Sequence, residues 1–145
     1  MAVLPVVAVA LMALSGPVLP EWTFDHDAGG WAANGDLGNV AVRGGLLCAD
    51  GVDSDPFFTC SGLAVEATPW QYVVLTLRAT RPGMGELFWT GETAGPYGGF
   101  TPEKKTPFTV TGDNALETVV LFPFWHTEGT IRQLRLDLYN GAHFE

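Results

Sequence analysis

Basic residues are scarce in this sequence. Seven lysines and arginines stand against 16 aspartates and glutamates, so the formal net charge is −9. Binding to nucleic acid depends on basic side chains that neutralise phosphates, and this composition offers no basic patch for that purpose. The sequence therefore predicts no nucleic-acid partner. Neutral sugars, cations and basic protein surfaces remain compatible with the charge.

Catalytic motifs are absent as well. Serine occurs only at positions 15, 54 and 61, never within G-x-S-x-G, and the three histidines form no H-E-x-x-H pair. Glu86 and Glu92 flank Trp89 and are the only carboxylate pair that suggests a glycosidase. We predict that the protein is not an enzyme, and a small glycosidase or lyase is the least favoured alternative.

No charged side chain occurs in the first 20 residues. The apolar stretch 3–14 has the length of a signal-peptide core and is too short to span a membrane, and Ala13 and Ser15 would allow cleavage after Ser15. We predict that residues 1–20 are a signal peptide or apolar leader and that the protein is secreted or at the cell surface. Because no lysine or arginine precedes the stretch, an apolar first strand or a misplaced start codon remains the alternative.

Cysteine is represented only by Cys48 and Cys60. In an exported protein this spacing predicts a disulfide, which would stabilise the fold by about 2–3 kcal/mol through the unfolded chain. Two buried free thiols are the alternative. A zinc site is not expected, since no second cysteine or histidine pair accompanies them.

What the sequence does contain is short alternating segments separated by turns rich in its 18 glycines and 10 prolines. In 130–139, Leu134, Leu136 and Leu138 share one face, whereas Arg135 and Asp137 share the other. Further strands are expected at 21–25, 39–43, 45–49, 56–60, 71–80, 85–90, 107–111 and 116–122. About nine short strands with regular turns predict an all-β antiparallel sandwich of the jelly-roll type, in a single domain over 21–145.

The C-terminal residues suggest an incomplete strand. Asn140-Gly141 is a hairpin-type turn, and 142–145 then has the pattern of a strand that stops soon after it starts. We expect the last strand to be incomplete, in either a truncated gene product or a fragment of a longer protein.

Several short motifs occur in the order seen in one group of extracellular domains. They are W-T-F-D (22–25), G-W (30–31), G-G-L-L (44–47), S-D-P-F (54–57), E-L-F-W-T (86–90), F-W (124–125) and G-T-I-R-Q-L-R-L-D-L (129–138). With these the chain resembles the galactose-binding-like, carbohydrate-binding-module-like jelly rolls of bacterial extracellular proteins. The resemblance implies a non-catalytic accessory module, one part of a larger protein, and it supplies no specific ligand. The alternative is a structural or protein-interaction sandwich from a cell-surface protein.

Aromatic side chains in loops suggest where a glycan would bind, because rings stack on the apolar faces of sugars. The candidates are Trp89, Tyr97, Phe100, Trp125 and His126, with Arg78 and Arg135 as hydrogen-bonding partners. The competing interpretation is that Trp89 and Trp125 pack in the core. Trp22, Phe24 and Trp31 are expected in the core or at the sandwich edge.

Acidic residues near the two ends of the domain raise the possibility of a structural calcium ion, although no cofactor is required. Asp25, Asp27, Asp36 and Glu145 would converge if the terminal strands paired. The loop with Asp50, Asp53 and Asp55 is a second candidate, but it lacks the spacing of an EF-hand.

Overall fold

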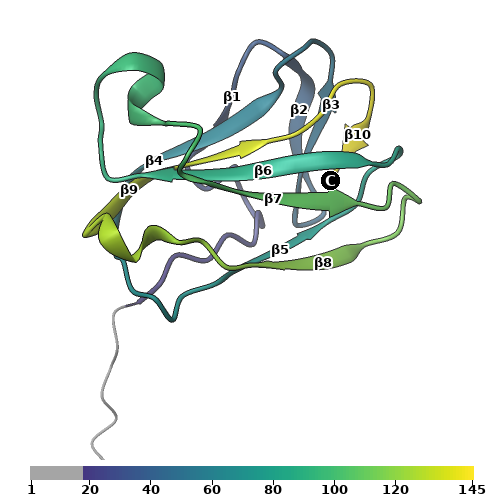
Figure 1. The fold of residues 1–145 in the computed structure, drawn as a ribbon. Helices are drawn as coiled ribbons and strands as arrows, with labels where there is room; N and C mark the ends of the chain where they lie inside the picture. Colours follow the sequence, from purple (N-terminus) through teal and green to yellow (C-terminus); the bar gives the residue numbers. More distant parts are fainter. Residues whose placement is uncertain (1–17) are drawn as a thin grey trace, which may run out of the picture.

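The computed structural model describes residues 18–145, which form a two-layered antiparallel β-sandwich (Figure 1). Its strands are β1 (Trp31–Ala33), β2 (Leu37–Arg43), β3 (Leu46–Gly51), β4 (Phe57–Glu66), β5 (Val73–Leu77), β6 (Gly83–Thr90), β7 (Lys105–Val110), β8 (Glu117–Leu121), β9 (Thr130–Asp137) and β10 (His143–Phe144). The predicted fold class, an all-β antiparallel sandwich, is confirmed.

The strands are distributed equally between the two layers. The first layer is a five-stranded sheet in the order β1-β4-β9-β6-β7. In the second layer, β10 pairs with β3, and β5 pairs with β8. Phe144 bridges to Ala79, just beyond β5, so β10 joins these two parts into the order β2-β3-β10-β5-β8.

Alternation along the strands explains why the layers stack. On β9, Leu134 and Leu136 face the interior, whereas Arg135 and Asp137 make ion-pair contacts on the outer face. A strand with this period of two is apolar on one side only, so it buries that side against another sheet.

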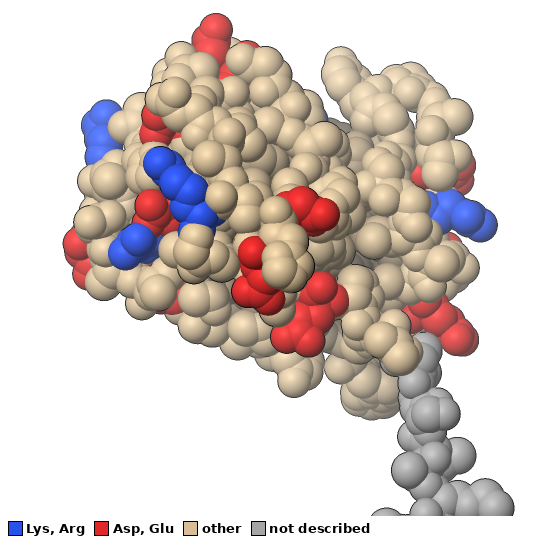
Figure 2. Space-filling model, turned by 180° about the vertical axis from the view of Figure 1, so that it is seen from behind, with Lys and Arg blue, Asp and Glu red and all other residues tan. Residues whose placement is uncertain are grey.

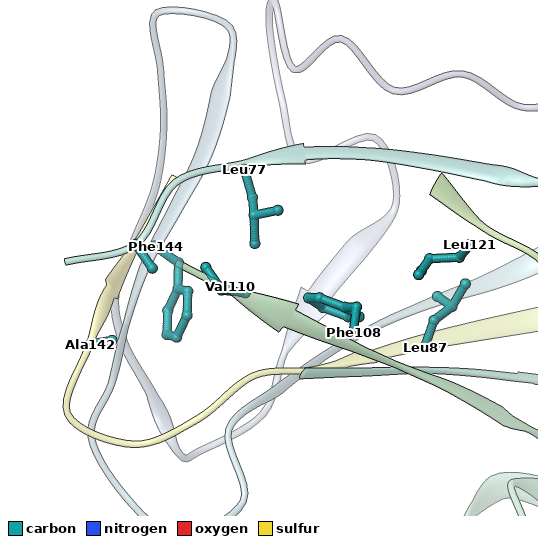
Figure 3. Packing of buried hydrophobic residues seen from close by; sticks show 8 residues of the cluster. Leu77, Leu87, Phe108, Val110, Leu121, Ala142 and Phe144 are labelled. Atoms are coloured by element: carbon teal, nitrogen blue, oxygen red, sulfur yellow. The ribbon is translucent and has the colours of Figure 1, made fainter. Parts of the chain in front are cut away.

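The main core lies between the layers (Figure 3). Leu77, Leu121 and Phe144 of the second layer meet Leu87 and Phe108 of the first, and all five are buried. Burial of each such side chain contributes about 1.5–3 kcal/mol through the hydrophobic effect.

Residues 21–25, predicted as a strand, do not form one. Phe24 has a φ of 53°, in the left-handed region that interrupts an extended strand. The segment is held by Trp22 instead, whose indole N–H donates to the Gly29 carbonyl at 3.0 Å and whose ring meets Trp31 edge-on at 5.4 Å. Trp22 and Trp31 therefore lie partly buried against the core, as expected.

The predicted disulfide is not formed: Cys48 and Cys60 are free and buried. They belong to different layers, Cys48 to β3 and Cys60 to β4. Ala49 packs in the core beside Phe58, so its neighbour Cys48 points to the outer side of its sheet, toward Glu145. Cys60 lies on the same face of β4 as Phe58, which places the two thiols on opposite sides of β3.

We expect neither thiol to react readily with Ellman's reagent in the native protein, and both to react once it is unfolded in denaturant without reductant. Burial shields both sulfur atoms, and it also raises the pKa of the Cys60 thiol, which lowers the thiolate fraction that reacts. A protein that yields two thiols only after reduction would contain the disulfide after all.

The proposed leader falls almost wholly at residues 1–17, outside the described residues. Within 18–145, no helix is long and apolar enough to cross a membrane.

Candidate functional site

Three of the aromatic candidates from the sequence are buried and cannot stack on a ligand in this conformation. Trp89 and Trp125 are only 2% and 5% exposed, and Phe100 is buried as well. Trp89 alternates in phase with the core residue Leu87, so β6 turns its ring inward. Trp125 follows Pro123 in a short 3-10 helix, but its ring meets Trp89 edge-to-face at 6.2 Å. The prediction that these three rings are accessible to a glycan is therefore wrong.

Tyr97 and His126 are exposed, as expected, but they lie in different loops. Tyr97 belongs to the loop between β6 and β7, and His126 to the loop between β8 and β9. The buried Gln133 holds the Tyr97 loop in place, because its side-chain N–H groups donate to the carbonyls of Glu92 and Gly98. Tyr97 remains a candidate contact on this loop.

Arg135 lies on the outer face of the first sheet, where other protein groups already occupy it. Its guanidinium stacks on Phe57 at 3.7 Å from the ring centroid and pairs with Asp137 at 2.5 Å and Asp55 at 3.0 Å. Burial raises the pKa of the Asp137 carboxyl, although the hydrogen bond from Arg135 opposes that shift. The arginine is committed to this internal cluster, and Arg78 lies in the other layer, so the two do not act together.

The proposed glycosidase carboxylates differ in their surroundings. Glu86 lies on β6 and pairs with Lys105 at 2.6 Å, whereas Glu92 is exposed in the following loop.

The proposed calcium ligands do not converge. Among residues 18–145, no three histidine, cysteine, aspartate or glutamate side chains are arranged to hold a metal ion. Asp25 accepts from the Thr23 hydroxyl, Asp27 from the Gly29 N–H and Asp36 from the Asp55 N–H. Glu145 pairs with Arg78 instead, because β10 lies beside the residues that follow β5, and the segment 21–25 forms no strand.

The strongest candidate surface is one that the sequence analysis did not select. Trp70 and Tyr72 precede β5, and Phe122 and Phe124 follow β8; we call these four side chains the aromatic face. Trp70 and Phe124 are 87% and 78% exposed, and Tyr72 and Phe122 are 58% and 64% exposed. The start of β5 lies beside the end of β8 in their antiparallel pair, and the Tyr72 and Phe122 ring centroids are 6.3 Å apart. Four exposed rings therefore lie at one end of the second layer.

Gln71 fixes both segments that carry the aromatic face, the one before β5 and the one after β8. Its side-chain oxygen accepts hydrogen bonds from the Thr68 N–H and from the Trp125 indole N–H, each at 2.8 Å. Its amide nitrogen donates to the Glu66 carbonyl at 2.8 Å. The loop with Trp70 and Tyr72 is thus tied to Trp125, the residue next to Phe124, so the buried tryptophan positions exposed rings.

Outward-facing side chains, most of them polar, continue along the same face of the second layer. Tyr72, Val74, Thr76 and Arg78 alternate outward on and beside β5 and span about 20 Å at strand spacing. The hydroxyl of Thr76 lies 3.3 Å from that of Thr118 on β8. Both hydroxyls are exposed and available to a polar ligand.

Beyond Thr76 the face becomes an ion-paired cluster. His143 Nδ1 lies 2.5 Å from Asp50 Oδ1, and Arg78 pairs with Glu145. A hydrogen bond from Asn39, followed by that from His143, lowers the pKa of the Asp50 carboxyl. Burial would raise the pKa of Glu145, but the hydrogen bonds and charge interactions with Arg78 and His143 together outweigh it and lower that pKa. Seen from behind, the surface of the molecule is mostly uncharged, with scattered carboxylates and fewer basic groups (Figure 2).

A signal for the aromatic face was present in the sequence. Tyr72 shares the polar side of the alternating segment 71–80 with Thr76 and Arg78, and an aromatic ring on a polar side is a surface ring. Phe122 and Phe124 alternate in the same way around the buried Pro123. These two groups of rings are neighbours only because β5 pairs with β8. Patterns within two segments more than 40 residues apart do not reveal that pairing.

Comparison with known proteins identifies the fold. No protein-family model and no curated protein sequence matches the chain. Among solved structures, one described as "CBM4 structure and function" superimposes with a TM-score of 0.58 at 18% identity, over 84% of this chain and 92% of that one. The chain accordingly has the fold of a carbohydrate-binding-module-like β-sandwich domain.

Proposed function

We propose that this protein is a non-catalytic, extracellular carbohydrate-binding module that holds a glycan on the aromatic face. The observation that supports this most is the exposure of Trp70, Tyr72, Phe122 and Phe124 at one end of β5 and β8. Clustered exposed rings are costly in water and are typical of surfaces that bind a partner. Their apolar faces match those of sugar rings.

The surroundings of the rings favour a neutral glycan over a charged one. The hydroxyls of Thr76 and Thr118 lie on the same face and can exchange hydrogen bonds with sugar hydroxyls. The net charge of −9 would repel an acidic polysaccharide. The fold likeness to a carbohydrate-binding module supports the same class of ligand.

A protein-interaction role is the second candidate, and one observation favours it. Val74 and Val120 lie between the rings and the threonines and are both exposed. A continuous apolar strip of this kind also suits a protein surface. Binding of purified neutral polysaccharides separates the two functions, because a protein-interaction surface would not bind them.

We expect Trp70→Ala to weaken binding of a neutral polysaccharide at least tenfold, and Tyr72→Ala to weaken it by a similar factor. Each change removes one stacking ring, and about 1.4 kcal/mol of binding energy corresponds to tenfold in affinity. Both rings are exposed, so thermal stability should change little. Isothermal titration against a panel of soluble neutral glucans, xylans and mannans measures the effect.

Tyr97→Ala is the matched control, since Tyr97 is an equally exposed ring in another loop. If Tyr97→Ala abolished binding and Trp70→Ala did not, the site would lie on the loop between β6 and β7. Absence of binding to every polysaccharide at millimolar sugar would contradict the proposed function.

A further inference from the structure

The exposed apolar side chains of β5 and β8 form one strip that is two strands wide. The two strands run side by side, below β6 and β7 in Figure 1. Val74 lies directly opposite Val120, and continuing that register by two residues places Tyr72 opposite Phe122. We call the aromatic face together with these two valines the apolar strip: Trp70, Tyr72, Val74, Val120, Phe122 and Phe124.

The side chains of the apolar strip project outward instead of lining a groove. Even Val74 and Val120, in the middle of the strip, are 55% and 47% exposed, and the rings of Trp70 and Phe124 are far more so. A binding cleft, by contrast, encloses roughly 70–90% of the surface of its ligand. The apolar strip therefore contacts a ligand from one side only, and a ligand that is itself flat would gain the largest contact.

Polar groups are scarce along the apolar strip. Its six side chains carry only two polar groups, the Tyr72 hydroxyl and the Trp70 indole N–H. The hydroxyls of Thr76 and Thr118 lie at one end, and the first charged side chain further along β5 is Arg78, which is already in an ion pair. A site that selects one dissolved ligand uses several placed polar groups to do so. The apolar strip instead offers stacking area and few hydrogen bonds.

We propose, building on the proposed function, that the apolar strip binds the flat surface of an ordered, insoluble neutral polysaccharide in preference to a single dissolved chain. In such a solid the hydroxyls of neighbouring chains bond to one another, so the scarcity of polar groups on the strip leaves few of them without partners. Contact between the two apolar surfaces releases water from both. A chain within the solid is also already ordered, whereas a dissolved chain loses conformational freedom when it binds.

The rings of the strip can adjust to a plane while their backbone stays fixed. The planes of Tyr72 and Phe122 are inclined at 49° to each other, so the two rings are not coplanar in the free protein. Both are more than half exposed, and exposed side chains change rotamer within nanoseconds. The β5–β8 ladder and the hydrogen bond from Trp125 to Gln71 hold the backbone beneath them. A rigid base with rings that rotate is suited to a flat ligand.

The test compares the ordered and the dissolved form of the same polysaccharide. The full chain is mixed with microcrystalline cellulose, crystalline chitin or crystalline mannan, and the protein left in solution after centrifugation gives a binding isotherm. Isothermal titration gives the dissociation constant for the dissolved hexasaccharide of each. For at least one of the three polysaccharides, the crystalline form should bind at least tenfold more tightly than its hexasaccharide.

Val120→Glu tests whether the contact is flat. A carboxylate in the middle of the strip would lose its water beneath a solid surface and find no partner there, so binding to the crystalline form should fall at least tenfold. A dissolved chain leaves the carboxylate open to water, so hexasaccharide binding should fall less than threefold. Val40→Glu is the matched control, because Val40 is exposed to a similar degree, 44%, on β2 at the opposite edge of the same layer.

The control variant should bind both forms like the unmodified protein. Circular dichroism shows whether each variant retains the β-sandwich. If Val120→Glu does not, Val74→Glu replaces it in the comparison, since Val74 is the exposed residue directly opposite.

Several results would overturn the proposal. Hexasaccharide binding as tight as binding to every crystalline form would show that a single chain is the ligand, and would leave the proposed function intact. Equal effects of Val120→Glu and Val40→Glu on crystalline binding would place the contact elsewhere. Equally tight binding to phosphatidylcholine vesicles would assign the strip to a membrane surface. Absence of binding to any polysaccharide, dissolved or crystalline, would contradict the proposed function as well.

Discussion

Replacing Trp125 by alanine should lower the free energy of unfolding by about 3–5 kcal/mol, the range for removing a buried aromatic side chain. The ring is buried between the layers, meets Trp89 at 6.2 Å and donates its indole N–H to Gln71 at 2.8 Å. The substitution leaves a cavity and removes one of the two donors to the Gln71 side-chain oxygen. Urea denaturation followed by circular dichroism measures the change.

Trp125→Phe separates packing from hydrogen bonding. Phenylalanine keeps an aromatic ring in the core but cannot donate to Gln71, so a smaller loss of about 1–2 kcal/mol is expected. The same variant should weaken glycan binding, because Gln71 would hold the loop with Trp70 less firmly. A decrease in the free energy of unfolding below about 1 kcal/mol for Trp125→Ala would show that the ring is not part of the core. Removing a buried aromatic side chain costs more than that.

Gly112→Ala is expected to be the most disruptive small substitution in the turns, lowering the free energy of unfolding by about 3 kcal/mol or more. Gly112 has a φ of 69°, and an added Cβ would lie 1.9 Å from the Arg81 carbonyl carbon and 2.0 Å from the Pro82 nitrogen. Both of those atoms are backbone, so no side-chain rotation can relieve the overlap. The turn after β7 would have to separate from the turn between β5 and β6.

Gly44→Ala provides the matched control. Gly44 also has a positive φ, 59°, but an added Cβ would meet nothing within 4 Å. Its cost is therefore only the conformational penalty of about 1 kcal/mol. Equal losses for the two variants in urea denaturation would contradict the close approach of Gly112 to Arg81 and Pro82.

Local patterns in the sequence determined the fold class and most of the strands. Alternation in 130–139 predicted β9 and the outward position of Arg135 and Asp137, because side chains in a strand point to opposite faces whatever the partner strand is. Glycine- and proline-rich spacers predicted the turns for a similar reason, since those residues restrict or extend the backbone locally. Only at 21–25, where Phe24 takes a left-handed conformation, did a predicted strand fail to form.

Tertiary structure alone decided which distant residues meet. Trp125 lies in a loop, a place typical of surface rings, but it is buried because two distant segments bring it against Trp89. Cys48 and Cys60 have a spacing compatible with a disulfide, yet β3 and β4 enter different layers and the thiols remain free. Tyr72 and Phe122 form a surface only because β5 pairs with β8. Contacts between segments far apart in the chain depend on how sheets assemble, and periodicity within one segment carries no information about that.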